Sequence, residues 1–149
     1  MKMQWILVAN GSLARIFNRA GVGDPLVPLE TIDYPEGRLK DSELERDRQG
    51  HERSDHSSAA THFEPRTDTR HKVMHQFARE LAERLEEGLV DGEYETLWLT
   101  ASHPFLGELK AALSRAVSAR LQWTHDADFT GLDVGTLESR LRELRRPER

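Results

Sequence analysis

Residues 5–19 read WILVANGSLARIFNR, and this stretch decides the fold. Residues 5–9 are apolar on both faces, which is typical of a central strand covered from both sides. The Asn-Gly-Ser turn at residues 10–12 leads into a second strand at 13–19. Because a tight turn joins strands antiparallel, we predict a hairpin whose first strand lies inside the sheet.

Further strands and one long helix follow this hairpin. Residues 26–34 predict a third strand, which Pro28 places at an edge or at its own start. An i,i+4 apolar stripe from Val73 to Leu89 predicts an amphipathic helix, because residues at this spacing share one helix face. We expect that helix to begin near residue 67 or 68 and to stop at Gly88 or Gly92.

The last part of the chain alternates strands and helices. Residues 94–101 predict a buried strand, and Ser102 is expected to cap the next helix, which carries Pro104 in its first turn. The core stripe of that helix runs from Leu106 to Val117. A half-exposed strand is predicted at 119–125, and a final helix uses the apolar residues Val134, Leu137, Leu141 and Leu144.

The order β-β-β-α-β-α-β-α predicts a single α/β domain over residues 1–149. Right-handed crossovers then place strand 5–9 near the centre of a mixed five-stranded sheet, antiparallel to 13–19 and parallel to 94–101. This is the ribonuclease H-like arrangement, and the middle domain of eukaryotic and archaeal peptide-chain release factors is similar to it. We expect six side chains in its core: Trp5, Leu7, Phe77, Leu81, Leu97 and Leu99.

Composition limits the classes of function. The chain has 149 residues, a net charge of −5 and no cysteine, so disulfides, thiolate metal sites and a cysteine nucleophile are excluded. The negative charge argues against binding nucleic acid through bulk electrostatics but leaves room for a local basic patch. The apolar run at the N-terminus is too short for a signal peptide, and no stretch could span a membrane. We expect a cytoplasmic protein.

An irregular polar insertion interrupts the pattern at residues 36–66. Large apolar side chains are sparse there, and Asp, Glu, Lys and Arg dominate. Connections of this length without secondary structure are usually functional or disordered. We interpret the segment first as a surface excursion and second as a binding loop.

One candidate site binds an anion at the carboxyl edge of the parallel strands. The helix after Ser102 offers free N–H groups and a positive dipole end there, and His103 lies in its first turn. Asn10 follows the neighbouring central strand, so both segments can border one crevice. Lys110 lies one to two turns further along the helix. The alternative is that Ser102 is only a helix cap.

Histidines provide a metal hypothesis. Five of the seven lie between residues 51 and 75: His51, His56, His62, His71 and His75. The last two are spaced i,i+4 on one helix face, which suits zinc or nickel. A complete site would need further ligands from the insertion, so we predict that His71 and His75 lie near the surface without a third protein ligand.

Other chemistries find less support. A ribonuclease H-like nuclease needs carboxylates on the first strand to hold two metal ions, and that strand carries no acid and ends at Asn10. No Walker or dinucleotide-binding glycine loop occurs, so no cofactor is predicted. Arginines of the last helix could form a basic stripe facing RNA, although they also suit the negative end of the helix dipole. They are Arg140, Arg142, Arg145 and Arg146.

Several segments, taken in order, resemble the bacterial family called host attachment proteins, "protein required for attachment to host cells". They are residues 8–17 (VANGSLARIF), 37–44 (GRLKDSEL) with 47–48 (DR), 77–82 (FARELA) and 99–109 (LTASHPFLGEL). The resemblance implies the release-factor-like fold and a ribosomal connection, whereas the family name implies adhesion to a host. The chain departs from the family at residues 127–132, where relatives carry Lys-Asp-Leu-Thr-Lys-Leu and both lysines are absent here.

The leading hypothesis is a non-enzymatic cytoplasmic binding module whose partner is the ribosome, RNA or another protein. No Gly-Gly-Gln tripeptide occurs, so the peptidyl-tRNA hydrolysis of release factors is not expected. One alternative is a hydrolase or metal-dependent enzyme that uses the histidine-rich segment. Another is an accessory factor that acts on attachment indirectly.

Overall fold

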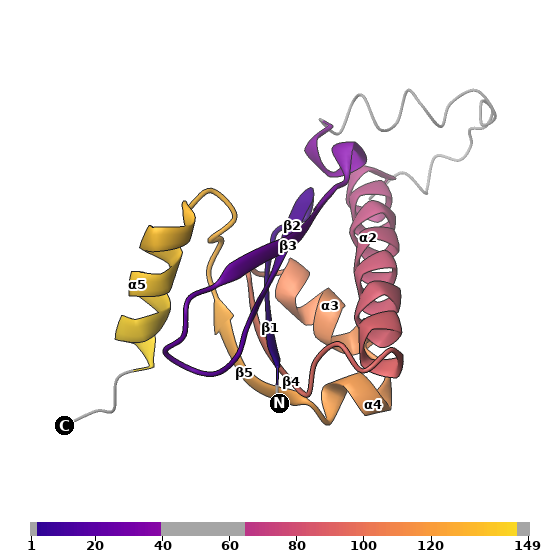
Figure 1. The fold of residues 1–149 in the computed structure, drawn as a ribbon. Helices are drawn as coiled ribbons and strands as arrows, with labels where there is room; N and C mark the ends of the chain where they lie inside the picture. Colours follow the sequence, from indigo (N-terminus) through magenta and orange to yellow (C-terminus); the bar gives the residue numbers. More distant parts are fainter. Residues whose placement is uncertain (1–2, 40–64, 146–149) are drawn as a thin grey trace.

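The computed structural model describes residues 3–39 and 65–145 (Figure 1). Their strands form one five-stranded sheet in the order β3-β2-β1-β4-β5. The strands are β1 (Gln4–Ala9), β2 (Leu13–Arg19), β3 (Val27–Asp33), β4 (Thr96–Ala101) and β5 (Leu121–Asp126). The predicted α/β class with a mixed five-stranded sheet is confirmed.

β1 is the central strand, as its two-sided apolar pattern predicts. It pairs antiparallel with β2, so that Leu7 lies opposite Ile16, and parallel with β4, so that Leu7 also lies opposite Leu99. All six residues of β1 are buried. β3 pairs antiparallel with β2 at one edge, and β5 pairs parallel with β4 at the other.

Helices cover the two faces of the sheet unequally (Figure 1). The first face carries α2 (Pro65–Val90), α3 (Phe105–Ala112) and α4 (Arg115–Ser118). Of the described helices, α5 (Val134–Leu144) alone packs on the second face, where Leu137 and Leu141 contact Ile6, Val8 and Trp98. A short 3-10 helix, η1 (Pro35–Arg38), follows β3.

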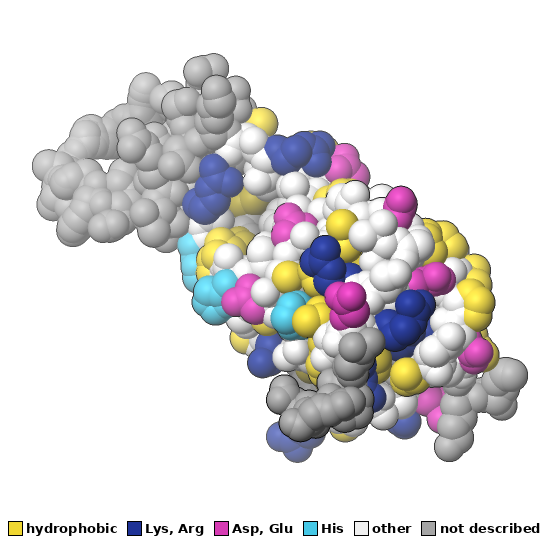
Figure 2. Space-filling model, turned by 90° about the vertical axis from the view of Figure 1, so that its left-hand side faces the viewer, with side chains coloured by type: hydrophobic (Ala, Val, Ile, Leu, Met, Phe, Trp, Pro, Cys, Tyr) yellow, Lys and Arg dark blue, Asp and Glu magenta, His cyan; other side chains and the backbone are white. Residues whose placement is uncertain are grey.

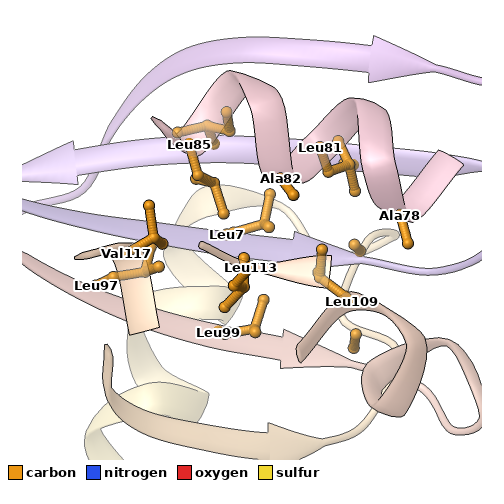
Figure 3. Packing of buried hydrophobic residues seen from close by; sticks show 14 of the residues in the cluster. Leu7, Ala78, Leu81, Ala82, Leu85, Leu97, Leu99, Leu109, Leu113 and Val117 are labelled. Carbon is orange, nitrogen blue, oxygen red and sulfur yellow. The ribbon is translucent and has the colours of Figure 1, made fainter. Parts of the chain in front are cut away.

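The larger core lies between α2, α3, α4 and the first face. In Figure 3 Leu81 and Leu85 of α2 point toward Leu7, while Leu97 and Leu99 of β4 lie toward Leu109 and Val117. The helical period of α2 and the outward and inward alternation of the strands bring these side chains together. All six residues predicted for the core are at most 1% exposed: Trp5, Leu7, Phe77, Leu81, Leu97 and Leu99.

The long helix extends slightly beyond its predicted start. α2 begins at Pro65, two residues before the expected start, and continues through Gly88 to Val90. Gly92, with φ of 74°, follows its end, in the left-handed region where glycine is favoured. Of the two predicted stops, Gly88 is therefore wrong, and the helix ends just before Gly92.

The single helix predicted after Ser102 is divided into two. α3 ends at Ala112, Leu113 is extended, and α4 starts anew with Ser114 as its N-cap. The Ser114 hydroxyl accepts a hydrogen bond from the Val117 N–H at 3.1 Å and donates to Glu86 of α2 at 2.6 Å. A serine that caps a helix and bonds to another helix favours a break over continuation.

The predicted polar insertion is only partly within the described chain. η1 and the start of α2 occupy its ends, and residues 40–64 lie outside the described residues. In the part of the chain that is described, no helix has the length and apolar character needed to span a bilayer.

Candidate functional site

The segments predicted to border one crevice meet at the carboxyl ends of β1 and β4. Ala9 and Ala101 are paired in the parallel ladder, so both strands end at the same edge. A pocket of about 140 Å³ lies beside that edge. It is lined by Gly11, Ser102, His103, Pro104 and Phe105 and, from the first-face side, by Gly37, Arg70, Val73 and Met74.

Asn10 is held in a network within the chain. Its Nδ2 donates to Asp128 Oδ2 at 2.9 Å and to Thr130 Oγ1 at 3.2 Å, and its Oδ1 accepts from the Ser12 N–H at 2.8 Å. Burial raises the pKa of Asp128, but the hydrogen bonds from Asn10 and Thr130 together lower it by more. The net pKa therefore lies below its ordinary value. The side chain of Asn10 thus ties the β1–β2 turn to the loop after β5.

A carboxylate of the chain lies at the start of α3. The N-cap is Pro104, without a side-chain capping bond, and the His103 N–H donates to Asp126 Oδ1 at 3.1 Å. The prediction that Ser102 caps the helix is wrong, because the N-cap is Pro104, two residues later, and no side chain caps the helix. His103 and Lys110 are both exposed, and Lys110 is not among the residues that line the pocket. The anion site at this edge stays a prediction.

The two histidines of α2 lie at the surface, as predicted. Their side chains are 59% and 55% exposed, and both approach Glu108 of α3: His71 Nε2 and His75 Nδ1 are each 3.4 Å from one of its carboxylate oxygens. Among residues 3–39 and 65–145, no three His, Asp or Glu side chains are placed so that they could hold a metal ion. His51, His56 and His62 lie outside the described residues.

A row of aromatic rings lies on the second face of the sheet, toward the β5 edge. Trp98 of β4 packs against Trp123 of β5 with ring centroids 4.9 Å apart. The Trp123 and His125 rings are parallel within 1° at 5.6 Å, and Phe129 follows at 5.8 Å from His125. Trp123 and His125 are half-buried, because α5 covers the inner strands and leaves the edge strand partly open. We call these four residues the aromatic row.

Arginines accompany the aromatic row. The guanidinium carbon of Arg145 lies 5.1 Å from the Trp98 ring centroid, and that of Arg140 lies 5.6 Å from the Phe129 centroid, both from α5. Arg19 of β2 lies over Trp98 at 4.6 Å. Seen from the α5 side, Lys and Arg side chains alternate with Asp and Glu around hydrophobic patches (Figure 2). The face is therefore locally basic without being uniformly positive.

The sequence analysis did not assign the aromatic row to a site. Trp123 and His125 are two residues apart in a strand, so they share a face, and this spacing was the available signal. The contribution of Trp98 and of the α5 arginines to the same surface depends on tertiary packing. That contribution required the structure.

A family model described as "Protein required for attachment to host cells" matches residues 5–141. The chain belongs to this family. The resemblance found in the sequence is thereby confirmed, and none of the curated proteins matches the chain.

Solved structures share the fold of this family member at low identity. One, described as an archaeal protein, is 13% identical with a TM-score of 0.52, covering 96% of this chain and 34% of its own. The archaeal translation termination factor aRF1 is 9% identical with a TM-score of 0.49, covering 95% of this chain and 39% of its own. The chain thus spans well under half the length of both, and the likeness to the first concerns the fold alone.

Proposed function

We propose that this host-attachment family member is a non-enzymatic cytoplasmic module that binds single-stranded RNA and associates with ribosomes. The observation that carries the proposal is the parallel pair of half-buried rings, Trp123 and His125, on the edge strand of a sheet face that a single helix covers. Single-stranded nucleic acid is held by stacking bases on such rings beside cationic groups.

The geometry of the pair suits base stacking. The two rings are parallel within 1°, with centroids 5.6 Å apart, and belong to alternate residues of β5, so they lie on the same face of the strand. Every base has a π-face, and one stacked base contributes about 1–3 kcal/mol to binding. Among the strands of residues 3–39 and 65–145, β5 pairs with β4 alone, and none lies along its other edge. An RNA strand can therefore approach the rings from that edge.

Charge decides where RNA can bind on this protein. The net charge of −5 repels a polyanion at long range, so binding depends on local cations such as Arg140 and Arg145. Asp126 and Asp128 stand near one end of the aromatic row and disfavour phosphate there. We expect modest affinity that falls with salt. An RNA-binding module of this kind would act on host attachment indirectly, through gene expression.

The test compares fluorescence anisotropy of a labelled single-stranded RNA with the wild-type protein and with Trp123→Leu, which removes the ring and keeps an apolar side chain. We expect affinity to fall about fivefold or more, because one stacked base is lost. The matched control is Gln122→Ala, an exposed neighbour on the same strand, which should bind like the wild type. Melting temperatures of all variants verify folding.

Two further arms make the test decisive. The variant His103→Glu adds a negative charge at the carboxyl edge of the parallel strands. If it lost RNA affinity while Trp123→Leu did not, the RNA would bind at that edge, and the proposal that it stacks on the aromatic row would be contradicted. Sedimentation of native lysate with and without RNase tests the ribosome. The proposal requires cosedimentation that RNase treatment abolishes.

A further inference from the structure

A second pocket lies on the second face of the sheet, beside the C-terminal end of α5. It has a volume of about 320 Å³ and is bounded by the end of β2, the turn before β3 and the last two turns of α5. Its apolar walls come from Val22, Pro25 and Leu141, and Trp98 lies at its base. A concave space of this size and composition is typical of a small-molecule site.

Arg19 is the unusual residue of this pocket. It is only 6% exposed, and its Nε donates to Gln4 Oε1 at 2.8 Å. Its Nη2 is fully buried, and no acceptor for it exists among the described residues. Buried polar groups in proteins nearly always have a partner, so a buried guanidinium N–H without one requires an explanation.

The charge of Arg19 is likewise not neutralised. No carboxylate in residues 3–39 or 65–145 lies within ion-pair distance of it. Asp24 and Glu138 line the same pocket, but a Glu138 oxygen already accepts the Leu26 N–H at 2.8 Å. Burial lowers the pKa of Arg19 most. Asp24 raises this pKa, repulsion from Arg145 lowers it, and Glu138 raises it, so the net pKa lies below its ordinary value.

Repulsion between cations indicates what the pocket lacks. Arg19 and Arg145 both lie over the Trp98 ring, at 4.6 and 5.1 Å from its centroid, and Arg142 lines the same pocket. Three arginines thus face two acids, which leaves the pocket with one uncompensated positive charge. A negatively charged group with oxygen acceptors would compensate this positive charge.

We infer that this pocket binds a small organic anion, with one carboxylate or phosphate group held by the Arg19 guanidinium and an apolar body packed against Pro25 and Leu141. The guanidinium offers the paired donors that planar or tetrahedral oxyanions accept. The inference does not rest on RNA binding. The pocket shares Trp98 and Arg145 with the proposed RNA surface, but the two rings proposed to stack bases, Trp123 and His125, do not line it.

The probes are phenyl phosphate and benzoate. Inorganic phosphate, which lacks the ring, tests the need for an apolar body, and neutral benzamide, which lacks the charge, tests the need for an anion. Binding is followed by the amide resonances of residues 21–24 and Leu26 and the indole N–H of Trp98 in the full chain. We expect one or both aromatic anions to shift these resonances, and the stronger one distinguishes carboxylate from phosphate. Benzamide should leave them unchanged, and inorganic phosphate should bind more weakly than phenyl phosphate.

The variants are Arg19→Met, which removes the guanidinium, and Arg142→Gln at the exposed rim. Arg115→Gln is the matched control, since Arg115 is an exposed arginine of α4 that does not line the pocket. We expect Arg19→Met to weaken anion binding about tenfold or more. Because this variant also leaves the buried Gln4 oxygen without its donor, its melting temperature is measured beside its affinity. Arg142→Gln provides a weaker loss if Arg19→Met does not fold, and Arg115→Gln should bind normally.

Several results would overturn the inference. They are an absence of shifts at residues 21–24 and Leu26, equal binding of benzamide, and unchanged affinity in both Arg19→Met and Arg142→Gln. Displacement of the aromatic anions by single-stranded RNA, lost in Arg19→Met, would instead assign the pocket to an RNA phosphate. RNA binding that is lost in Trp123→Leu while anion binding persists would keep the two sites separate.

Discussion

Gly88 of α2 lies directly against the indole ring of Trp5 in β1. A Cβ at position 88 would stand 2.7 Å from Trp5 Cζ3 and closer still to Cη2. The helix continues through Gly88, so its role is a close approach between helix and sheet. Trp5 is fully buried and stacks on Tyr94 with ring centroids 4.5 Å apart. The large ring therefore has little room to move away.

We expect Gly88→Ala to destabilise the protein by about 1–3 kcal/mol, the usual range for overpacking a core. Replacing glycine in a helix by alanine would by itself stabilise by up to about 1 kcal/mol. Gly107→Ala in α3 is the matched control, because a Cβ there meets nothing closer than His103 Cε1 at 4.0 Å. Urea unfolding should show opposite signs for the two variants, and equal stabilisation of both would contradict the packing argument.

The bond between Asn10 and Asp128 predicts a pH-dependent effect. The pKa of Asp128 is lowered in the folded protein, so its contribution to stability is complete above its unfolded pKa of about 3.9 and is lost as pH falls through the folded pKa. We expect Asn10→Ala to destabilise at neutral pH, with a difference from the wild type that shrinks in acid. Urea unfolding at several pH values measures this difference.

A double-mutant cycle with Asp128→Asn isolates the pair. Asp33 and Asp133 also have lowered pKa values, so acid weakens every variant, and only the coupling between positions 10 and 128 is informative. A coupling that is the same at neutral and at acidic pH would show that the charge of Asp128 is not involved.

The histidines of α2 predict weak metal binding. His71 and His75 are exposed, and each approaches the Glu108 carboxylate directly. We expect protein purified without an affinity tag to contain no stoichiometric zinc or nickel by mass spectrometry. Added zinc should raise the melting temperature little, because weak binding stabilises little. Stoichiometric metal that disappears in His71→Ala but stays in His103→Ala would contradict this expectation.

The sequence predicted the parts of the fold that depend on local periodicity. The two-sided apolar run at residues 5–9 placed β1 in the centre, and the i,i+4 stripe of α2 placed Phe77 and Leu81 in the core. The break at Leu113 was missed, because the apolar stripe continues through it. Ser114 marks the new start, where its hydroxyl accepts from the Val117 N–H and donates to Glu86 of α2.

The sites were less predictable than the fold. The sequence analysis placed Asn10, Ser102 and His103 at one sheet edge from topology alone, and the structure brings the turn after β1 and the segment before α3 to one pocket. It could not show that Asp126 reaches the His103 N–H from another strand. Nor could it show that Arg19 is buried with its Nη2 unpaired among the described residues, since burial and pairing depend on β4 and α5.

Tyr94 predicts how the protein responds to alkaline pH. Its hydroxyl donates to the Leu85 carbonyl at 2.7 Å, and burial raises its pKa to about 12. Because the folded pKa lies above the unfolded value of about 10, the neutral hydroxyl stabilises the fold fully below pH 10. That stabilisation is lost as pH rises toward about 12, and the loss amounts to about 2–3 kcal/mol.

Tyr94→Phe should cost about 1 kcal/mol at neutral pH, through the lost hydrogen bond, and should remove most of the decline above pH 10. Tyr34, the only other tyrosine, also has a raised pKa, chiefly through burial, so Tyr34→Phe is the matched control. Urea unfolding between pH 9 and about pH 12 measures the decline. In Tyr34→Phe the remaining phenol should ionise well above pH 10 while the protein is folded, because Tyr94 is 2% exposed. A phenol that ionised near pH 10 in that folded variant would show that the hydroxyl of Tyr94 is open to water.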